Sequence, residues 1–122
     1  MKTKILIFGG TGLLGTNLVY YLKENFKIFL NFHEKKFFSK HAKYIKVINS
    51  KDINIREIEK KISKINPKII INCAPNTDLE FCEKKPNKTL FANSILPEIL
   101  SKISFEKKIK LVHFSTDHLY SG

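Results

Sequence analysis

The chain has 122 residues, of which 43% are hydrophobic and 27% charged, so its length suits one domain with one core and its apolar content excludes a disordered tail. The net charge of +11 comes almost entirely from lysine, with Arg56 as the lone arginine. Arginine is the residue that phosphate and base recognition favours, and the lysines are scattered along the chain. We therefore interpret the charge as a solvated surface and expect no nucleic-acid partner.

The N-terminal segment and the cysteines argue against a membrane protein and against a metal protein. The apolar run from Ile5 to Phe8 is far shorter than a signal sequence or a membrane span, so we expect a cytoplasmic protein without a membrane partner. Cys73 and Cys82 form no C-x-x-C pair and have no nearby histidines at ligand spacing. This pattern predicts two reduced thiols and no metal site.

Short apolar runs alternate along the chain with helical patterns. Each run has about the length of a buried strand, and together they predict five strands, at residues 4–8, 28–32, 44–48, 69–73 and 110–114. The segment 34–43 is interpreted as loop or short helix.

Three segments between the runs have apolar residues at helical spacing, which predicts three helices that each bury one face. A proline removes a backbone hydrogen bond, so Pro97 either starts or kinks the third helix. The predicted faces consist of Leu14, Leu18, Tyr21 and Leu22 in the first helix, Ile55, Ile58, Ile62 and Ile65 in the second, and Leu96, Leu100 and Ile103 in the third.

This alternation indicates βαβ units with right-handed crossovers. The predicted fold class is α/β, a doubly wound Rossmann-like parallel sheet with strand order 3-2-1-4-5. Such sheets bind ligands at the carboxyl ends of the strands, at the point where the strand order reverses. We therefore expect the chemistry at the ends of the first and fourth strands.

A glycine-rich segment lies at that point. Gly9, Gly12 and Gly15 stand between the first strand and the first helix. Glycines there allow a tight turn, close approach of the main chain to a pyrophosphate, and close packing of helix and strand, while the helix N-terminus faces the anion. The segment predicts a dinucleotide-binding loop.

The spacing G-x-x-G-x-x-G resembles that of extended short-chain dehydrogenase/reductases. The closest resemblance is to the dTDP-4-dehydrorhamnose reductase group, which reduces a nucleotide-linked keto-sugar with NADPH or NADH. Four further stretches agree with this group in order, at residues 52–53, 67–74, 93–98 and 112–122.

The resemblance implies a cofactor site at the strand ends and a catalytic hydroxyl. It places the glycine loop at the pyrophosphate, Asp52 and Ile53 at the adenine, and the hydroxyl of Thr116 within reach of the reacting sugar oxygen. Its cofactor-binding residues are Gly9, Thr11, Gly12, Leu13, Leu14, Gly15, His33, Lys35, Lys36, Asp52, Ile53, Cys73, Ala74, Pro75, Asn93 and Ser115.

Purely structural roles are open for several of these residues. Asp52 is also a favoured residue type for capping the second helix. Asn93 could only hold backbone groups together, and Ser115 and Thr116 could be ordinary turn residues.

The adenosine ribose of the cofactor is contacted by a residue at the end of the second strand, where NAD-preferring relatives have an acidic side chain. In this chain the position falls at His33, which is not a carboxylate. Lys35 and Lys36 could neutralise a 2′-phosphate, whereas Glu34 opposes it. The sequence favours NADP, with NAD as the alternative.

Two features depart from the family's pattern. Pro75 stands where many relatives have glycine, and it removes a backbone donor near the cofactor. The Tyr-x-x-x-Lys pair that serves as the family's proton relay is absent from the sequence. We therefore expect residues 1–122 to be a truncated NAD(P)-binding domain without its substrate domain, and activity of this chain alone stays open.

Three functions remain open from the sequence. The first is the cofactor-binding portion of a reductase that acts on a nucleotide-linked sugar. The second is a non-catalytic NADP-binding regulatory subunit resembling that of methionine adenosyltransferase. The third is an epimerase or dehydratase of the same superfamily. A fifth strand without a neighbour would also favour association into homo-oligomers.

Overall fold

The computed structural model describes residues 2–9, 13–31, 40–48, 54–73 and 94–114. Within these residues the strands form one parallel sheet in the order β3-β2-β1-β4-β5. The predicted α/β class and strand order are confirmed. The strands are β1 (Thr3–Phe8), β2 (Phe26–Asn31), β3 (Ala42–Ile45), β4 (Ile69–Asn72) and β5 (Lys110–His113).

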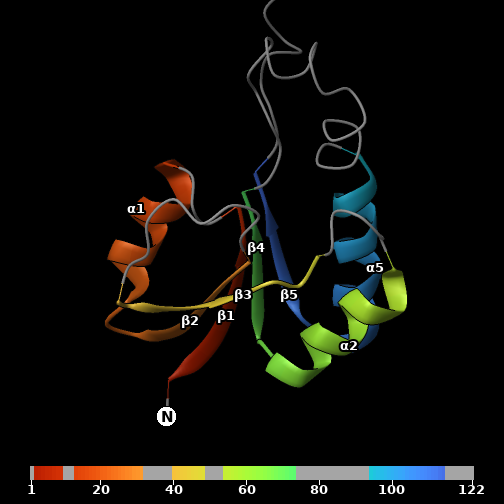
Figure 1. Ribbon diagram of the computed structural model, residues 1–122, viewed down its shortest axis with the longest axis horizontal. Helices are drawn as coiled ribbons and strands as arrows, with labels where there is room; N and C mark the ends of the chain where they lie inside the picture. The colour runs from red at the N-terminus through yellow and green to blue at the C-terminus, as the bar shows by residue number, and fades with distance from the viewer. Residues whose placement is uncertain (1, 10–12, 32–39, 49–53, 74–93, 115–122) are drawn as a thin grey trace, which may run out of the picture.

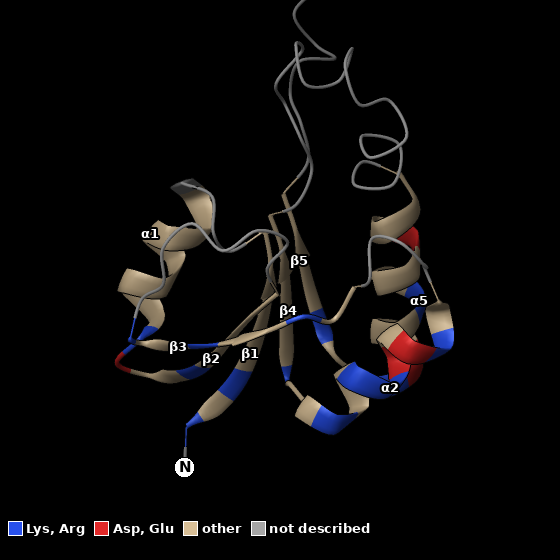
Figure 2. Ribbon diagram, in the orientation of Figure 1, with Lys and Arg blue, Asp and Glu red and all other residues tan. Residues whose placement is uncertain are grey.

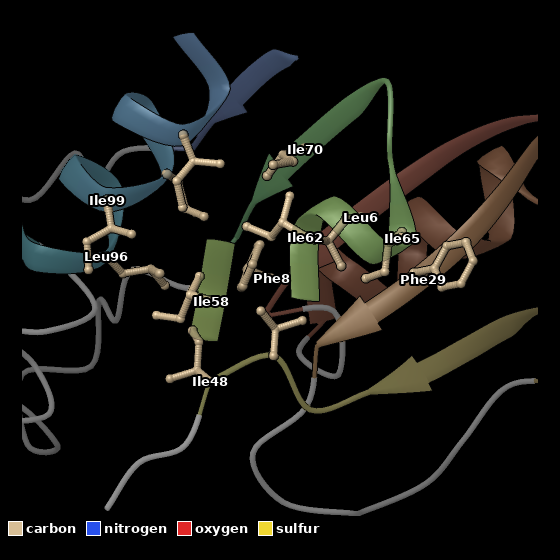
Figure 3. Close-up of a cluster of buried hydrophobic side chains, with 13 residues drawn as sticks. Leu6, Phe8, Phe29, Ile48, Ile58, Ile62, Ile65, Ile70, Leu96 and Ile99 are labelled. Atoms are coloured by element: carbon tan, nitrogen blue, oxygen red, sulfur yellow. The ribbon is translucent and has the colours of Figure 1, made fainter. Parts of the chain in front are cut away.

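Helices cover both faces of the sheet. Helix α1 (Leu13–Leu22) lies on one face, and helices α2 (Ile55–Ile65) and α5 (Leu96–Lys107) lie on the other (Figure 1). Side chains of β1 alternate between the two sides, so Ile5 and Ile7 pack with the cluster under α1 while Leu6 and Phe8 pack with the cluster under α2 and α5. The cluster under α2 and α5 is the larger of the two and joins these helices to the sheet (Figure 3).

Helix α2 is fixed at both ends by asparagines. The side chain of Asn54 accepts hydrogen bonds from the backbone N–H groups of Arg56 and Glu57, at 3.0 and 3.3 Å. At the other end Asn66 adopts a left-handed conformation with φ of 55°, and its N–H bonds the carbonyl of Ile62. The structural alternative that made Asp52 the cap is therefore wrong, because Asn54 stands directly before the first helical turn and performs that role.

The buried face of α1 differs from the predicted one. Leu14 and Tyr21 are 42% and 75% exposed, whereas Val19 is buried and Gly15 lies inside against the sheet. The segment is apolar on nearly all sides, so helical spacing alone does not single out one face. Because Gly15 has no side chain, that side of the helix can approach the strands closely.

Two other expectations need correction. The third strand is formed by Ala42–Ile45 rather than by residues 44–48, although Val47 and Ile48 beyond it are fully buried. Ile55 is 53% exposed and lies off the buried face of α2, which consists of Ile58, Ile62 and Ile65.

The remaining expectations agree with the structure. The other four strands lie within two residues of their predicted bounds. Leu96, Leu100 and Ile103 are buried as predicted, and Pro97 stands in the first turn of α5, so it starts that helix rather than kinking it.

We predict that Ile62→Ala lowers the free energy of unfolding by about 2–5 kcal/mol, because it removes a fully buried side chain from the larger cluster. Ile55→Ala on the same helix is the control and should cost less than about 1 kcal/mol, since that side chain is half exposed. Urea denaturation followed by circular dichroism measures both. Equal losses for the two variants would contradict the packing described above.

Candidate functional site

The strand order reverses at β1, which has β2 on one side and β4 on the other. A backbone hydrogen bond of 2.8 Å from Cys73 N to Phe8 O joins the ends of β1 and β4 there. Gly9 follows Phe8 directly and adopts a positive φ of 76°, a conformation that favours glycine. The chain thus turns away from the sheet at the edge where doubly wound folds bind ligands.

Few of the predicted site residues lie in the described part of the chain. Cys73 donates the hydrogen bond between the ends of β1 and β4, and Gly9 follows its acceptor Phe8. Leu13 begins α1, Leu14 is exposed on that helix, and Gly15 is buried in it. The predicted site residues that lie outside the described residues are Thr11, Gly12, His33, Lys35, Lys36, Asp52, Ile53, Ala74, Pro75, Asn93, Ser115 and Thr116.

Cys73 is the titratable group at the junction of β1 and β4. It is a free cysteine of intermediate exposure. Burial raises the pKa of its thiol from the ordinary value of 9.0 to about 11, because the partly apolar surroundings penalise the thiolate. At neutral pH the thiol is therefore protonated and a poor nucleophile.

Sequence reasoning missed a polar contact between the ends of β4 and β5. Asn72 is fully buried, and its Nδ2 lies 3.1 Å from Nδ1 of His113 on the neighbouring strand. The amide N–H of Asn72 donates to Nδ1 of His113 in the tautomer that leaves this ring nitrogen without a proton. The contact ties together two strands whose next residues are predicted to approach the cofactor.

Sequence reasoning also missed Asn31, which closes β2. Its side chain is 3% exposed, and its Oδ1 accepts a 2.8 Å hydrogen bond from the backbone N–H of Val47. The available signal for Asn31 and Asn72 was the same: each is an amide that directly follows three apolar residues at the end of a strand.

Charges in the described ranges are spread over several elements. Figure 2 shows basic residues on strands and helices alike, with acidic residues beside them on α2 and α5. One contact of this kind joins Lys107 of α5 to Glu59 of α2 at 3.8 Å. Over the same ranges no group of His, Cys, Asp and Glu side chains could hold a metal ion. No helix of the described part is long and apolar enough to cross a bilayer.

Comparison with known proteins identifies the family. A family model described as the RmlD substrate binding domain matches residues 3–122. The chain belongs to this family. This match confirms the resemblance to the dTDP-4-dehydrorhamnose reductase group that the sequence motifs indicated.

Individual relatives agree with this membership. The chain is 28% identical over 119 residues to dTDP-4-dehydrorhamnose reductase of Salmonella typhimurium, covering 97% of the chain and 36% of that protein. A Bacillus anthracis dTDP-4-dehydrorhamnose reductase solved in complex with NADP matches all of the chain and 39% of its own length, with 28% identity and a TM-score of 0.72.

A second solved structure supports the fold of the RmlD-family chain. A hypothetical dTDP-4-dehydrorhamnose reductase from Sulfolobus tokodaii superimposes with a TM-score of 0.79 and 24% identity, covering the whole chain and 41% of that protein. The chain therefore spans less than half the length of these relatives.

We predict that Cys73 is alkylated slowly below pH 9 and that its rate rises with a midpoint near pH 11, as the pKa of the thiol requires. Iodoacetamide labelling in a Cys82→Ser background isolates this thiol. In denaturant the midpoint should return to the ordinary value of about 9. A midpoint near 9 in the folded chain would show that Cys73 is solvated.

The same shift has a consequence for stability. A thiol whose pKa is raised by folding contributes stability that is fully present below pH 9 and is lost as the pH rises through 11. The unfolding free energy of the unmodified chain should therefore fall more steeply between these pH values than that of Cys73→Ala.

Proposed function

We propose that this RmlD-family chain is the NADP-binding portion of a reductase that acts on a nucleotide-linked keto-sugar, as its resemblance to dTDP-4-dehydrorhamnose reductase suggests. The observation that carries the proposal is the junction of β1 and β4, where Gly9 turns with positive φ beside the end of β4. A relative 28% identical to the chain is solved with NADP, which supports the same cofactor class here.

The pyrophosphate would bind at the glycine loop. Helix α1 begins at Leu13, so its first backbone N–H groups and the positive end of its dipole are available to an anion at this edge of the sheet. Gly12 would leave room for the main chain to approach the pyrophosphate, and Thr11 would contribute a polar group to the same loop. The buried Gly15 lets α1 pack closely enough to the sheet to hold this arrangement.

The two ends of the cofactor would lie on opposite sides of this loop. The segments that follow β2 and β3 would hold the adenosine end, and those that follow β4 and β5 the nicotinamide end. The adenosine residues would be His33, Lys35, Lys36, Asp52 and Ile53, and the nicotinamide residues Cys73, Ala74, Pro75, Asn93 and Ser115.

The residues of this chain would contribute orientation and one hydrogen bond to the reaction. Bound NADPH would supply a hydride to the keto carbon of the sugar. The hydroxyl of Thr116 would donate a hydrogen bond to the oxygen on which negative charge develops, since a preorganised donor stabilises that charge, and a separate general acid would supply the proton that completes the alcohol. The contact between Asn72 and His113 would hold the strand that leads to Thr116 in line with β4.

We predict that the chain binds NADPH and that Gly12→Val abolishes detectable binding, because a branched side chain would occupy the space required by the pyrophosphate. Fluorescence titration with NADPH measures both proteins. Ile55→Ala, exposed on α2, serves as the control and should bind like the unmodified chain. Equal affinity of the unmodified chain and Gly12→Val would remove the glycine loop from the site.

We also predict that NADPH binds at least about tenfold more tightly than NADH, because a charge-assisted contact with the 2′-phosphate is worth about 1.5–3 kcal/mol. Replacing Lys35 and Lys36 together by alanine should reduce this ratio without weakening NADH. The control is a double replacement of Lys60 and Lys64, which are exposed on α2. A preference for NADH in the unmodified chain would contradict the assignment of the two lysines.

A further inference from the structure

Asn31 is a buried polar residue to which the proposed reaction gives no role. It is the last residue of β2 and pairs in register with Phe8 of β1 and Ile45 of β3. The Asn31 side chain is only 3% exposed, and its two in-register partners, Phe8 and Ile45, are apolar. An amide in such surroundings destabilises the fold unless its polar atoms are hydrogen-bonded.

The amide of Asn31 continues the link between β2 and β3 beyond the end of their ladder. The ladder stops at the pair of Asn31 with Ile45. Past this point Oδ1 of Asn31 accepts hydrogen bonds from the backbone N–H groups of Val47, at 2.8 Å, and of Ile48, at 3.4 Å. A side-chain oxygen thus takes the place that a backbone carbonyl would have in a longer strand.

The segment held by Asn31 is also held by the core. The side chains of Val47 and Ile48 are each 1% exposed and belong to the cluster beneath α2 and α5. Figure 3 shows Ile48 close to Ile58 of α2. With its side chains in the core and its amides on Asn31, this backbone has a fixed position relative to the end of β2.

The two partners of these hydrogen bonds, Asn31 and residues 47–48, each precede residues assigned to the adenosine half of the cofactor. Asn31 stands two residues before His33, and Ile48 stands four residues before Asp52. We propose that Asn31 is a positioning residue: it holds the end of β2 and residues 47–48 relative to each other, and these are the two points from which the segments assigned to the ribose and to the adenine continue. This inference rests on the proposed function, because it assumes that these two segments bind adenosine.

The choice of an amide fits the proposed cofactor. A carboxylate at position 31 could accept the same two N–H groups, but its charge, two residues before His33, would repel a 2′-phosphate bound at the ribose end. The neutral oxygen of Asn31 makes both hydrogen bonds without adding negative charge at the ribose end.

Two variants of Asn31 and one control separate positioning from stability. Asn31→Leu keeps the size of the side chain and removes the acceptor. Asn31→Asp keeps the acceptor oxygen. The affinity of this variant is measured for NADH, which has no 2′-phosphate for the new negative charge to repel. Ile103→Val is the control, since it removes one methyl group from the same cluster on α5 and leaves Asn31 intact. All comparisons are made at equal distance below the melting temperature of each variant.

We expect Asn31→Leu to weaken the binding of NADPH, NADH and 2′,5′-ADP by a common factor of about tenfold or more. The factor should be common because the lost hydrogen bonds position the adenosine half, which all three ligands share. Asn31→Asp should retain NADH affinity within about threefold, and Ile103→Val should retain all affinities. Amide hydrogen exchange should accelerate at Val47 and Ile48 in Asn31→Leu and stay slow in Asn31→Asp.

The outcomes that overturn the inference differ from those that overturn the proposed function. If the unmodified chain binds neither NADPH nor 2′,5′-ADP, the proposed function is wrong and the adenosine role of Asn31 is wrong with it. If the unmodified chain binds but Asn31→Leu binds as well as Ile103→Val, only the positioning role is wrong. An Asn31→Asp variant that loses NADH as completely as Asn31→Leu would also overturn it.

Discussion

Strand β1 has hydrogen-bonded neighbours on both edges and buried side chains on both faces, and this enclosure constrains the rest of the molecule. Ile5 and Ile7 belong to the cluster under α1, and Leu6 and Phe8 to the cluster under α2 and α5, so neither helical layer can shift without disturbing the other. The one direction left open to the chain is past the carboxyl end, where Gly9 turns away from Phe8. The candidate site lies at this end of β1, whose edges and faces are occupied by the neighbouring strands and helices.

Sequence patterns predicted the strands well because buried parallel strands consist of continuous apolar residues, as in residues 5–8 of β1. The same reasoning misplaced β3, since Val47 and Ile48 are as apolar and as buried as a strand residue while their N–H groups bond a side chain instead of a ladder. It also misjudged α1, where Leu14 and Tyr21 are apolar in composition yet exposed. Burial and strand pairing are separate properties, and hydrophobicity reports only the first.

The site was predictable where backbone conformation demands a particular residue type and unpredictable where polar side chains meet across the fold. Gly9 belongs to the first kind, since its positive φ favours glycine. Asn31 and the pair of Asn72 with His113 belong to the second, because their partners lie on other strands. Both contacts occur at strand ends, and at Asn31 the ladder stops while backbone N–H groups still require partners.

The central position of β1 also bears on how the chain acquires its structure during synthesis. Ile5 finds its partner on one edge at Ile28, but its partner on the other edge is Ile69, 64 positions later in the sequence. At about 5–20 residues per second, a ribosome takes several seconds to supply that partner. Throughout this interval one edge of a strand with four consecutive apolar residues is unpaired, so this part of the nascent chain requires protection from association.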